Sequence, residues 1–332
     1  MSVRSALCTV RGALPSSQKL LVFGGAAAVS IASVVWWLRQ RRTCVLELNI
    51  FPVKSGKGNS VKRARVTARG FLGDRMFQIN DKDGKLCTAR DDTFVSLVQL
   101  QSNLSDDKLQ LKFPGGETHV VDLHSESAPV RVACMGAGEG TRPDNDRESL
   151  RDYGQEVSNW LSSHFGVPCR LTGIGGECER VVVMNGKQAQ PVDAGTPLSL
   201  ADEAPMLLTN AASLADLNRR LREKGEPPVP MNRFRPNIVI SAKPWEEDTW
   251  SRVRIGSVIF KVWQRNGRCK FTTIDVSSLK SGREPLNTLA TFRKSTAGSI
   301  DFGVHMIPER ASVGLDLQFG DDFVVLERRS QQ

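Results

Sequence analysis

The side chains best suited to chemistry in this sequence are a few cationic, hydroxyl and thiol groups. Lys54 and Arg75 carry fixed positive charge and Ser55 adds a hydroxyl donor, a combination that suits a phosphate group. The chain also has seven cysteines but no Cys-x-x-Cys pair, which argues against a disulfide framework. Scattered single cysteines indicate a reducing compartment, where one thiolate can act as a metal ligand or a nucleophile.

Familiar catalytic and binding motifs are absent from the sequence. The segment 54–58 (KSGKG) lacks the first glycine and the Ser/Thr of a phosphate-binding P-loop. No G-x-G-x-x-G opens a helix, no G-x-S-x-G serine-hydrolase motif occurs, and the four histidines lack zinc-ligand spacing. The net charge of +9 is concentrated in residues 1–42, which hold six Lys and Arg residues and no acidic residue. Since no recognition motif accompanies this charge, we expect no nucleic-acid partner.

Residues 20–38 (LLVFGGAAAVSIASVVWWL) are nineteen residues without a charge. A helix of this length spans roughly 28 Å of a hydrocarbon layer of about 30 Å. Trp36 and Trp37 lie at its end, where indole rings favour the membrane interface, and the basic run 39–42 follows. A cleaved signal or transit peptide is the alternative, but no small-residue cleavage site precedes the basic run. The segment is similar to signal anchors of the mitochondrial outer membrane, so we expect one transmembrane helix within a targeting segment 1–42 and a body that faces the cytosol.

The rest of the chain predicts a mainly β (α+β) fold with a few helices. Short apolar segments are separated by turn residues, as is typical of strands; they include 44–51, 64–68, 76–80, 85–89, 205–209 and 270–274. A chain of 332 residues exceeds the usual size of one core. We therefore expect two barrel-like β domains, 43–175 and 176–330, that meet at the Gly-rich stretch 173–176.

Two helices stand out from their apolar spacing. Ser149 and Asp152 are spaced to cap a helix whose apolar face includes Leu161, and Ser213 and Asp216 are spaced to cap a second. Both apolar faces are most simply explained as core packing.

Four segments resemble the MOSC family, and specifically the amidoxime-reducing components of mitochondria. They occur in the order that this family uses: 51–58 (FPVKSGKG), 70–77 (GFLGDRMF), 207–221 (LLTNAASLADLNRRL), and 233–241 with 267–275 (RFRPNIVIS and GRCKFTTID). Together with the predicted anchor, the resemblance runs along nearly the whole chain. The most specific part is the pair RPNIV and RC-x-x-TT-x-D. The resemblance implies a MOSC N-terminal β-barrel-like domain followed by a MOSC β-barrel domain.

The resemblance also implies a role for each polar position in binding molybdenum and a molybdopterin cofactor. Cys269 would be the sulfur ligand of the molybdenum, in keeping with the affinity of soft thiolates for transition metals. The terminal phosphate and the pterin would be held by Lys54, Ser55, Arg75, Asn210, Arg235 and Asn237. Asp275 would orient the loop or tune proton transfer, although it could equally be an ordinary turn or cap residue.

Gly267 departs from the family pattern. Close relatives have a small hydroxyl residue two positions before the ligand cysteine, whereas this chain has glycine. The change removes a possible hydroxyl contact to the pterin or metal, while the backbone donor of Gly267 stays available to the cofactor. We expect it to affect substrate positioning more than cofactor binding.

By resemblance, the chain would be a molybdenum-dependent oxidoreductase that removes oxygen from N-hydroxylated substrates such as amidoximes and hydroxylamines. Its electrons would come from NADH through a flavoprotein reductase and a b-type cytochrome, since this chain has no nucleotide or haem motif of its own. A non-catalytic carrier of the cofactor or of sulfur is the main alternative. An anchored protein-interaction barrel with a vestigial site is a second one.

The predicted anchor makes the topology testable. If residues 20–38 hold the chain in the mitochondrial outer membrane, protease added to intact mitochondria should destroy the body and leave matrix markers untouched. Immunoblotting of the body before and after protease measures this. A body that stays protected would contradict the outer-membrane placement.

Overall fold

The computed structural model describes residues 43–124, 128–134, 147–175, 178, 180–182 and 195–329. Within these residues strands outnumber helices, which confirms the prediction of a mainly β protein. The predicted membrane span at residues 20–38 lies outside the described residues. In the part of the chain that is described, no helix is long and apolar enough to cross a membrane.

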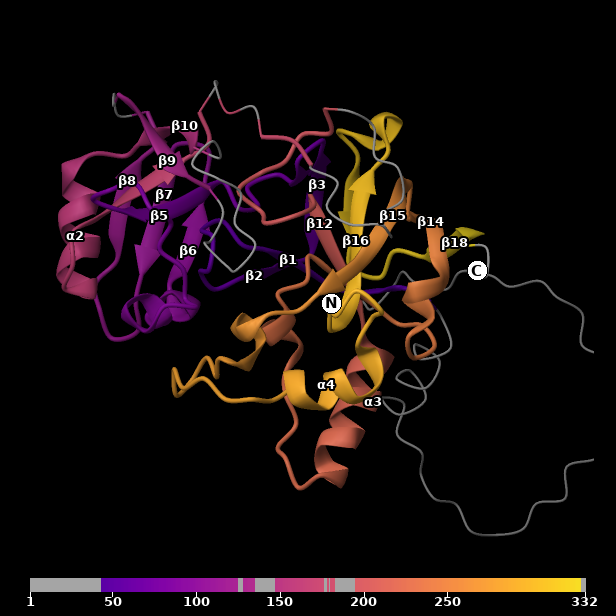
Figure 1. Ribbon diagram of the computed structural model, residues 1–332. Coiled ribbons are helices and arrows are strands. Elements are labelled where there is room, and N and C mark those ends of the chain that lie inside the picture. The colour runs from indigo at the N-terminus through magenta and orange to yellow at the C-terminus, as the bar shows by residue number, and fades with distance from the viewer. Residues whose placement is uncertain are drawn as a thin grey trace, which may run out of the picture. The chain divides into compact units, whose positions relative to one another are not determined.

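The largest sheet has eight strands and is built mostly from the second half of the chain (Figure 1). Its order is β18 (Phe323–Arg328), β14 (Trp250–Ile255), β15 (Val258–Gly267), β16 (Asp301–Pro308), β12 (Met206–Asn210), β13 (Ile238–Ile240), β1 (Val45–Ile50) and β2 (Asn59–Val61). Strands β12 and β13 are parallel, and the other neighbours are antiparallel.

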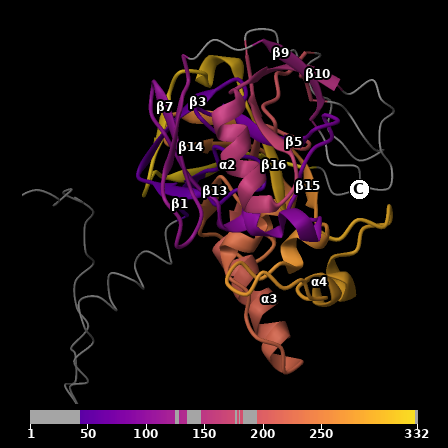
Figure 2. The same ribbon diagram turned by 90° about the vertical axis from the view of Figure 1, so that its left-hand side faces the viewer.

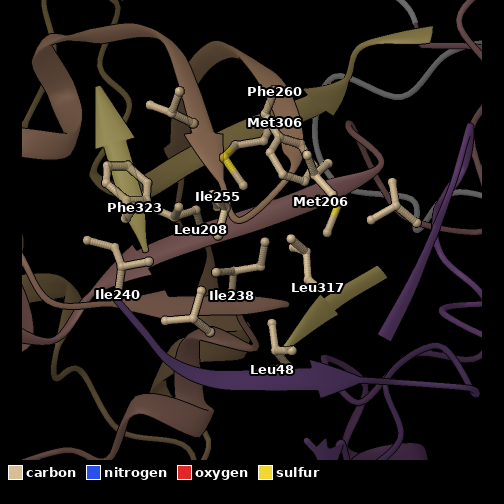
Figure 3. Packing of buried hydrophobic residues seen from close by; sticks show 14 of the residues in the cluster. Leu48, Met206, Leu208, Ile238, Ile240, Ile255, Phe260, Met306, Leu317 and Phe323 are labelled. Atoms are coloured by element: carbon tan, nitrogen blue, oxygen red, sulfur yellow. The ribbon is translucent and has the colours of Figure 1, made fainter. Parts of the chain in front are cut away.

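A second sheet shares the core of the first. It contains β17 (Asp316–Gln318), β3 (Arg63–Thr67) and β4 (Gly70–Phe71). Figure 3 shows Leu317 of β17 in the same cluster as Leu48 of β1 and Leu208 of β12, and all three side chains are fully buried. Burial of these side chains is what fixes the register, because a shift of one residue would turn each of them toward solvent.

The other strands form a separate group with its own core. One sheet contains β5 (Phe77–Asp81), β11 (Cys169–Gly173), β10 (Arg147–Asp152) and β9 (Pro129–Ala133), and another contains β6 (Gln101–Leu104), β7 (Lys108–Lys112) and β8 (His119–Asp122). Helix α2 (Gln155–Phe165) crosses this group in Figure 2 and buries Val157 and Leu161 in its core. The 3-10 helix η1 (Asp92–Gln99) contributes Leu97 to the same core.

Two of the sheets join strands from both sides of residue 175, near which the domain boundary is predicted. Strands β1 and β3, which precede residue 72, pair with β13 and β17 from the last third of the chain. Ile274 in turn packs into the core of the first group. The two halves of the sequence are therefore joined by shared sheets, and the loops after β1 and β4 lie against the second half.

The structure contains the two predicted helices but corrects where they begin. Ser149 and Asp152 belong to strand β10, and α2 begins after Gly154, whose N–H donates to the Asp152 carboxylate at 2.9 Å. Helix α3 (Ala211–Glu223) is capped by Asn210 rather than by Ser213. A Ser-x-x-Asp spacing therefore marked each helix but not its first residue.

Segment 270–274, predicted as a strand, also differs. It forms the 3-10 helix η4 (Lys270–Thr273), because the hydroxyls of Thr272 and Thr273 donate back to the carbonyls of Cys269 and Lys270 at 3.0 and 2.8 Å. Threonine is common in strands, but its hydroxyl can also stabilise a tight turn of this kind. The turn places Cys269 at its start.

The core of the eight-stranded sheet gives a stability prediction. Leu208→Ala should lower the free energy of unfolding by roughly 2–5 kcal/mol, because it leaves a cavity in the fully buried central strand β12. Leu326→Ala is the matched control on the edge strand β18, where the side chain is 39% exposed, and it should change stability by no more than about 0.5 kcal/mol. Urea unfolding followed by tryptophan fluorescence measures both, and equal losses would contradict the packing described here.

Candidate functional site

A cavity of 220 Å³ brings together most of the predicted site residues. Its walls come from the loop after β1, the turn after β4, the residues before β13 and the end of β15. Seven of the predicted site residues line the cavity: Lys54, Ser55, Arg75, Arg235, Asn237, Gly267 and Cys269. Segments from both ends of the described sequence therefore meet at one site.

Three of these residues have a backbone conformation that side chains rarely adopt. The φ angles of Ser55, Arg75 and Arg235 are 65°, 48° and 55°, and each such residue costs of order 1–3 kcal/mol. Hydrogen bonds hold the strained backbone, such as the one from the Arg75 N–H to the Phe51 carbonyl at 2.7 Å. Strain of this kind is characteristic of functional sites, where the surrounding structure fixes a conformation that the residue alone would avoid.

Two arginines give the cavity a strongly cationic wall. The Arg235 guanidinium lies 4.3 Å from the centre of the Phe51 ring, and burial, together with repulsion from Arg75, lowers the pKa of Arg235 to about 9. Burial also lowers the pKa of Arg268 to about 10. The Nε of Arg268 is buried and has no hydrogen-bond partner among the described residues. Cations that have lost water and keep unused donors favour an anionic ligand.

The cavity is also lined by a carboxylate, that of Asp202, which the sequence did not single out. The Nζ of Lys54 donates to the Leu200 carbonyl at 2.7 Å and to the Asp202 carboxylate, and Arg90 donates to the second oxygen of Asp202 at 3.0 Å. Burial lowers the pKa of Lys54. Desolvation opposes ionisation of Asp202, but Lys54 and Arg90 hold the pKa of this carboxyl well below its usual range.

Arg90 and Asp202 could have been found from the sequence. Arg90 directly follows the predicted strand 85–89, and Asp202 lies shortly before the predicted strand 205–209. A polar residue at the end of a predicted strand can face a binding site, and this signal could have selected both residues.

Arg75 and Asn237 line the cavity but are also tied to the fold. Arg75 donates to Asp74 at 2.5 Å and to Asn237 at 3.1 Å. The amide of Asn237 accepts from the Leu207 N–H at 3.1 Å and donates to the Asn49 carbonyl at 3.2 Å. Asn237 is 1% exposed, so its main contacts join strands β1, β12 and β13 beneath the site.

Asn210 does not line the cavity. Its side-chain oxygen accepts from the Ala212 N–H at 3.1 Å and caps α3, while its nitrogen donates to Glu247 at 3.0 Å and to the Lys243 carbonyl at 2.6 Å. The residue is fully buried. These contacts give Asn210 a role in fixing the start of the helix.

Asp275 lies outside the lining as well. One of its oxygens accepts from the N–H groups of Ser277 and Ser278 at 3.1 and 2.9 Å, and the other accepts from Arg233 at 2.6 Å. Bonds from Ser277 and Ser278 hold the pKa of Asp275 well below its usual range. Arg233 also donates to the Thr273 carbonyl at 3.2 Å. Asp275 therefore fixes the turn that follows η4, which is the cap role left open by the sequence.

Cys269 is the exposed thiol of the site. Of the cysteines that the structure describes, Cys269 alone is exposed; Cys44 is half-buried and the remaining four are buried. The Arg90 guanidinium lines the same cavity as the Cys269 thiol. Among the described residues no cluster of three or more His, Cys, Asp and Glu side chains could hold a metal ion. A metal bound at Cys269 would therefore take most of its ligands from a non-protein group.

Gly267 leaves room for a hydroxyl from a neighbouring segment. A Cβ at Gly267 would lie 2.4 Å from the Oγ of Ser299, and this hydroxyl donates to Asp301 at 2.6 Å. The residue type at position 267 is thus matched to Ser299. The Ser299 hydroxyl, from the loop before β16, occupies the space that a hydroxyl side chain at position 267 would take.

Comparison with known proteins gives the same family for both parts of the chain. Residues 43–168 match the model of the MOSC N-terminal beta barrel domain, and residues 195–324 match that of the MOSC domain. The chain is 31% identical to mitochondrial amidoxime reducing component 2 of Macaca fascicularis, over 88% of this chain and 89% of the relative. It is 31% identical to mitochondrial amidoxime-reducing component 1 of Homo sapiens, over 91% and 87%. It is also 31% identical to molybdenum cofactor sulfurase of Danio rerio over 81% of this chain, but spans only 32% of that longer protein.

The exposure of Cys269 predicts its reactivity. In protein prepared without metal, iodoacetamide should modify Cys269 faster than the buried cysteines, because the reagent must reach the thiolate. Cys134 should react slowly, since burial raises the pKa of its thiol to about 12. Peptide mass spectrometry over time measures each site, and Cys269→Ser is the control that should lose the fast label. Fast labelling of Cys134 instead would contradict the placement of these side chains.

Proposed function

Because the chain belongs to the family of MOSC domain proteins, with a MOSC N-terminal domain before the MOSC domain, we propose that it is a molybdenum-cofactor-dependent reductase of N-hydroxylated compounds. Its substrates would be amidoximes and hydroxylamines. The observation that carries the proposal is the exposed Cys269 at a cavity that is also lined by several cations. A thiol and several arginines in one place are what a metal bound to an anionic organic cofactor requires.

The residues present fit such a cofactor. Arg235 and Arg268 are partly buried cations with lowered pKa values, and an anion would restore the interactions that they have lost with water. The strained loop at Ser55 adds a hydroxyl, and Cys269 supplies the soft ligand that suits molybdenum. The bound cofactor would supply the redox chemistry, and the protein its binding and electrostatics.

The Lys54–Asp202–Arg90 group would orient this site. Arg90 and Lys54 both donate to Asp202, and Arg90 lines the same cavity as Cys269. Positive charge is therefore fixed in the cavity that holds the thiol before any ligand binds. Such preorganisation means that little rearrangement is needed on binding.

The electrons would come from outside the chain. We propose that a b-type cytochrome delivers them from an NADH-dependent flavoprotein reductase, since the sequence has no nucleotide or haem motif. Residues 20–38 would anchor the protein in the mitochondrial outer membrane with its body in the cytosol. The mitochondrial names of two relatives support this placement.

A carrier of the cofactor or of sulfur is a second candidate. The match to molybdenum cofactor sulfurase favours it, because there the similar segment is one part of a longer protein. A carrier would bind the cofactor in the same cavity and use Cys269 to hold sulfur. Turnover with an N-hydroxylated substrate distinguishes the two functions.

The proposal predicts that cofactor binding and turnover can be separated. Cys269→Ala should keep much of the pterin, because the phosphate and pterin contacts lie on other residues, but its reduction of benzamidoxime by a chemical electron donor should be lost. Lys54→Ala and Arg75→Ala should instead weaken pterin retention, each by about 1.5–3 kcal/mol for a charge-assisted hydrogen bond. The measurements are the pterin and molybdenum contents and the reduction rate of the purified full chain.

Two buried cysteines provide the matched controls. Cys87→Ala and Cys178→Ala remove thiols that are 3% exposed and outside the cavity lining, so both variants should stay active. Full activity in Cys269→Ala would contradict the ligand assignment. Molybdenum bound by a wild-type protein that reduces no N-hydroxylated substrate would favour the carrier.

A further inference from the structure

A histidine and a glutamate that the proposed function does not yet use lie on one side of the cavity. Both Glu203 and His305 belong to the cavity lining. The Nε2 of His305 is 3.1 Å from the Oε2 of Glu203. The imidazole is nearly enclosed, with a side chain 8% exposed, whereas that of Glu203 is 45% exposed. The pair thus reaches from the protein interior to the solvent in the cavity.

The backbone around His305 is rigid. His305 lies in β16 between two neighbouring strands, opposite Leu207 of β12 and Gln264 of β15. Its ring therefore has a fixed position relative to the cavity. Its second nitrogen, Nδ1, is buried and has no hydrogen-bond partner among the described residues, so the contacts at Nε2 decide where the imidazole carries its proton.

Asn266 makes the position of that proton unusual. The Nδ2 of Asn266 lies 2.9 Å from the Nε2 of His305, and the amide cannot reverse because its oxygen accepts from Arg268 at 2.5 Å. The Nε2 of His305 therefore faces a donor from Asn266 and an acceptor from Glu203 at the same time. When Nε2 carries a proton, it can donate to Glu203 but faces the Asn266 N–H, which is also a donor. When Nε2 carries no proton, it can accept from Asn266 but faces the Glu203 oxygen, which is also an acceptor.

The charged groups around the pair act in both directions. The hydrogen bond from His305 lowers the pKa of Glu203, which favours the proton on the imidazole. Asp202, adjacent in the chain, raises the affinity of Glu203 for the proton and Arg268 lowers it. Gln264 also donates to Glu203 at 3.3 Å. Asn266 opposes a proton on Nε2, whereas the bond to Glu203 favours one.

We propose that Glu203 and His305 form a proton-donating pair that protonates the leaving oxygen of the N-hydroxylated substrate. This inference rests on the proposed reductase function and names the groups that provide its proton. A hydrogen-bonded acid at the wall of the cavity is placed to donate its proton to a leaving group of a bound substrate. Glu203, at the exposed end, recovers a proton from solvent after each turnover.

The step balances for a hydroxylamine substrate. The N–O bond of R–NH–OH breaks, and the nitrogen is reduced by two electrons from the reduced cytochrome or from a chemical reductant. One proton from the pair converts the leaving OH group to water, and a second proton from solvent completes R–NH2. The products are the amine and one water molecule, and the pair returns to its starting state when Glu203 takes up a proton.

The experiment uses the purified full chain with its cofactor, reduced methyl viologen and benzamidoxime. Glu203→Gln and His305→Gln should each lower kcat about 100-fold, as expected for loss of a general acid, with KM, pterin and molybdenum content unchanged. Because the pair must hold a proton to donate it, wild-type kcat should be high at low pH and fall as pH rises through the apparent pKa of the pair. Both variants should lose this fall.

A second measurement follows the protonation of His305 by NMR and needs no turnover. In protein labelled with 15N-histidine, the NMR signal that is missing in His305→Gln identifies His305. Glu203→Gln should move the titration of this signal to lower pH by about one unit, a tenfold change in proton affinity, because a carboxylate no longer accepts from Nε2. Asn266→Ala should move it to higher pH, because the opposing N–H is removed.

Matched changes outside the cavity serve as controls. Glu309→Gln and His164→Gln alter residues that bond Arg252 and Ser96, and both should keep the wild-type kcat and pH profile. If wild-type protein with molybdenum reduces no substrate, the proposed function fails and this inference with it. If the wild type is active but Glu203→Gln and His305→Gln keep its kcat and pH profile, or if the two titration shifts are absent, the inference alone is overturned.

Discussion

Positive charge that is partly removed from water around one cavity is the constraint on which the site depends. Each cation there is held by a specific contact: Lys54 and Arg90 by Asp202, Arg75 by Asp74, Arg235 by the ring of Phe51, and Arg268 by Asn266. Without these contacts the charges would repel one another and turn toward solvent. The strained backbone at Ser55, Arg75 and Arg235 indicates that the fold accepts a local cost to keep them in place.

The strand order explains how these charges come together. Strand β1 pairs with β13 on one side and β2 on the other, so the loop that carries Lys54 and Ser55 lies close to the residues that precede β13. Asn237 joins the same strands through bonds to Leu207 and Asn49. Packing of the eight-stranded sheet therefore sets the position of the cationic wall. A change in the register of β1 would move Lys54 away from Asp202.

Sequence reasoning selected Lys54 and Arg75 because fixed positive charge beside a hydroxyl suits a phosphate, and it selected Arg235 through the family resemblance. It did not find which strands pair, since β1 and β13 are almost 200 positions apart and their apolar patterns fit many partners. Asn210 was assigned to the cofactor through the family resemblance. A residue between a strand and a helix can face a ligand or cap the helix, and the contacts of Asn210 with Glu247 and the Ala212 N–H give it the second role. Glu203 and His305 carry no local signal, since they come together only through the pairing of β12 with β16.

The balance of charge indicates what kind of ligand the cavity suits. The cavity is lined by five cations, Lys54, Arg75, Arg90, Arg235 and Arg268, and by two carboxylates, Asp202 and Glu203. A third carboxylate, Asp74, pairs with Arg75. Five positive and three negative groups leave a surplus of two positive charges, before His305 and Cys269 are counted. A terminal phosphate carries a charge of about −1.5 to −2 near neutral pH, which matches this surplus. A neutral ligand would leave the surplus positive charge without a counter-charge. A nucleotide triphosphate would carry more negative charge than this surplus. The arrangement therefore favours a ligand with one phosphate group.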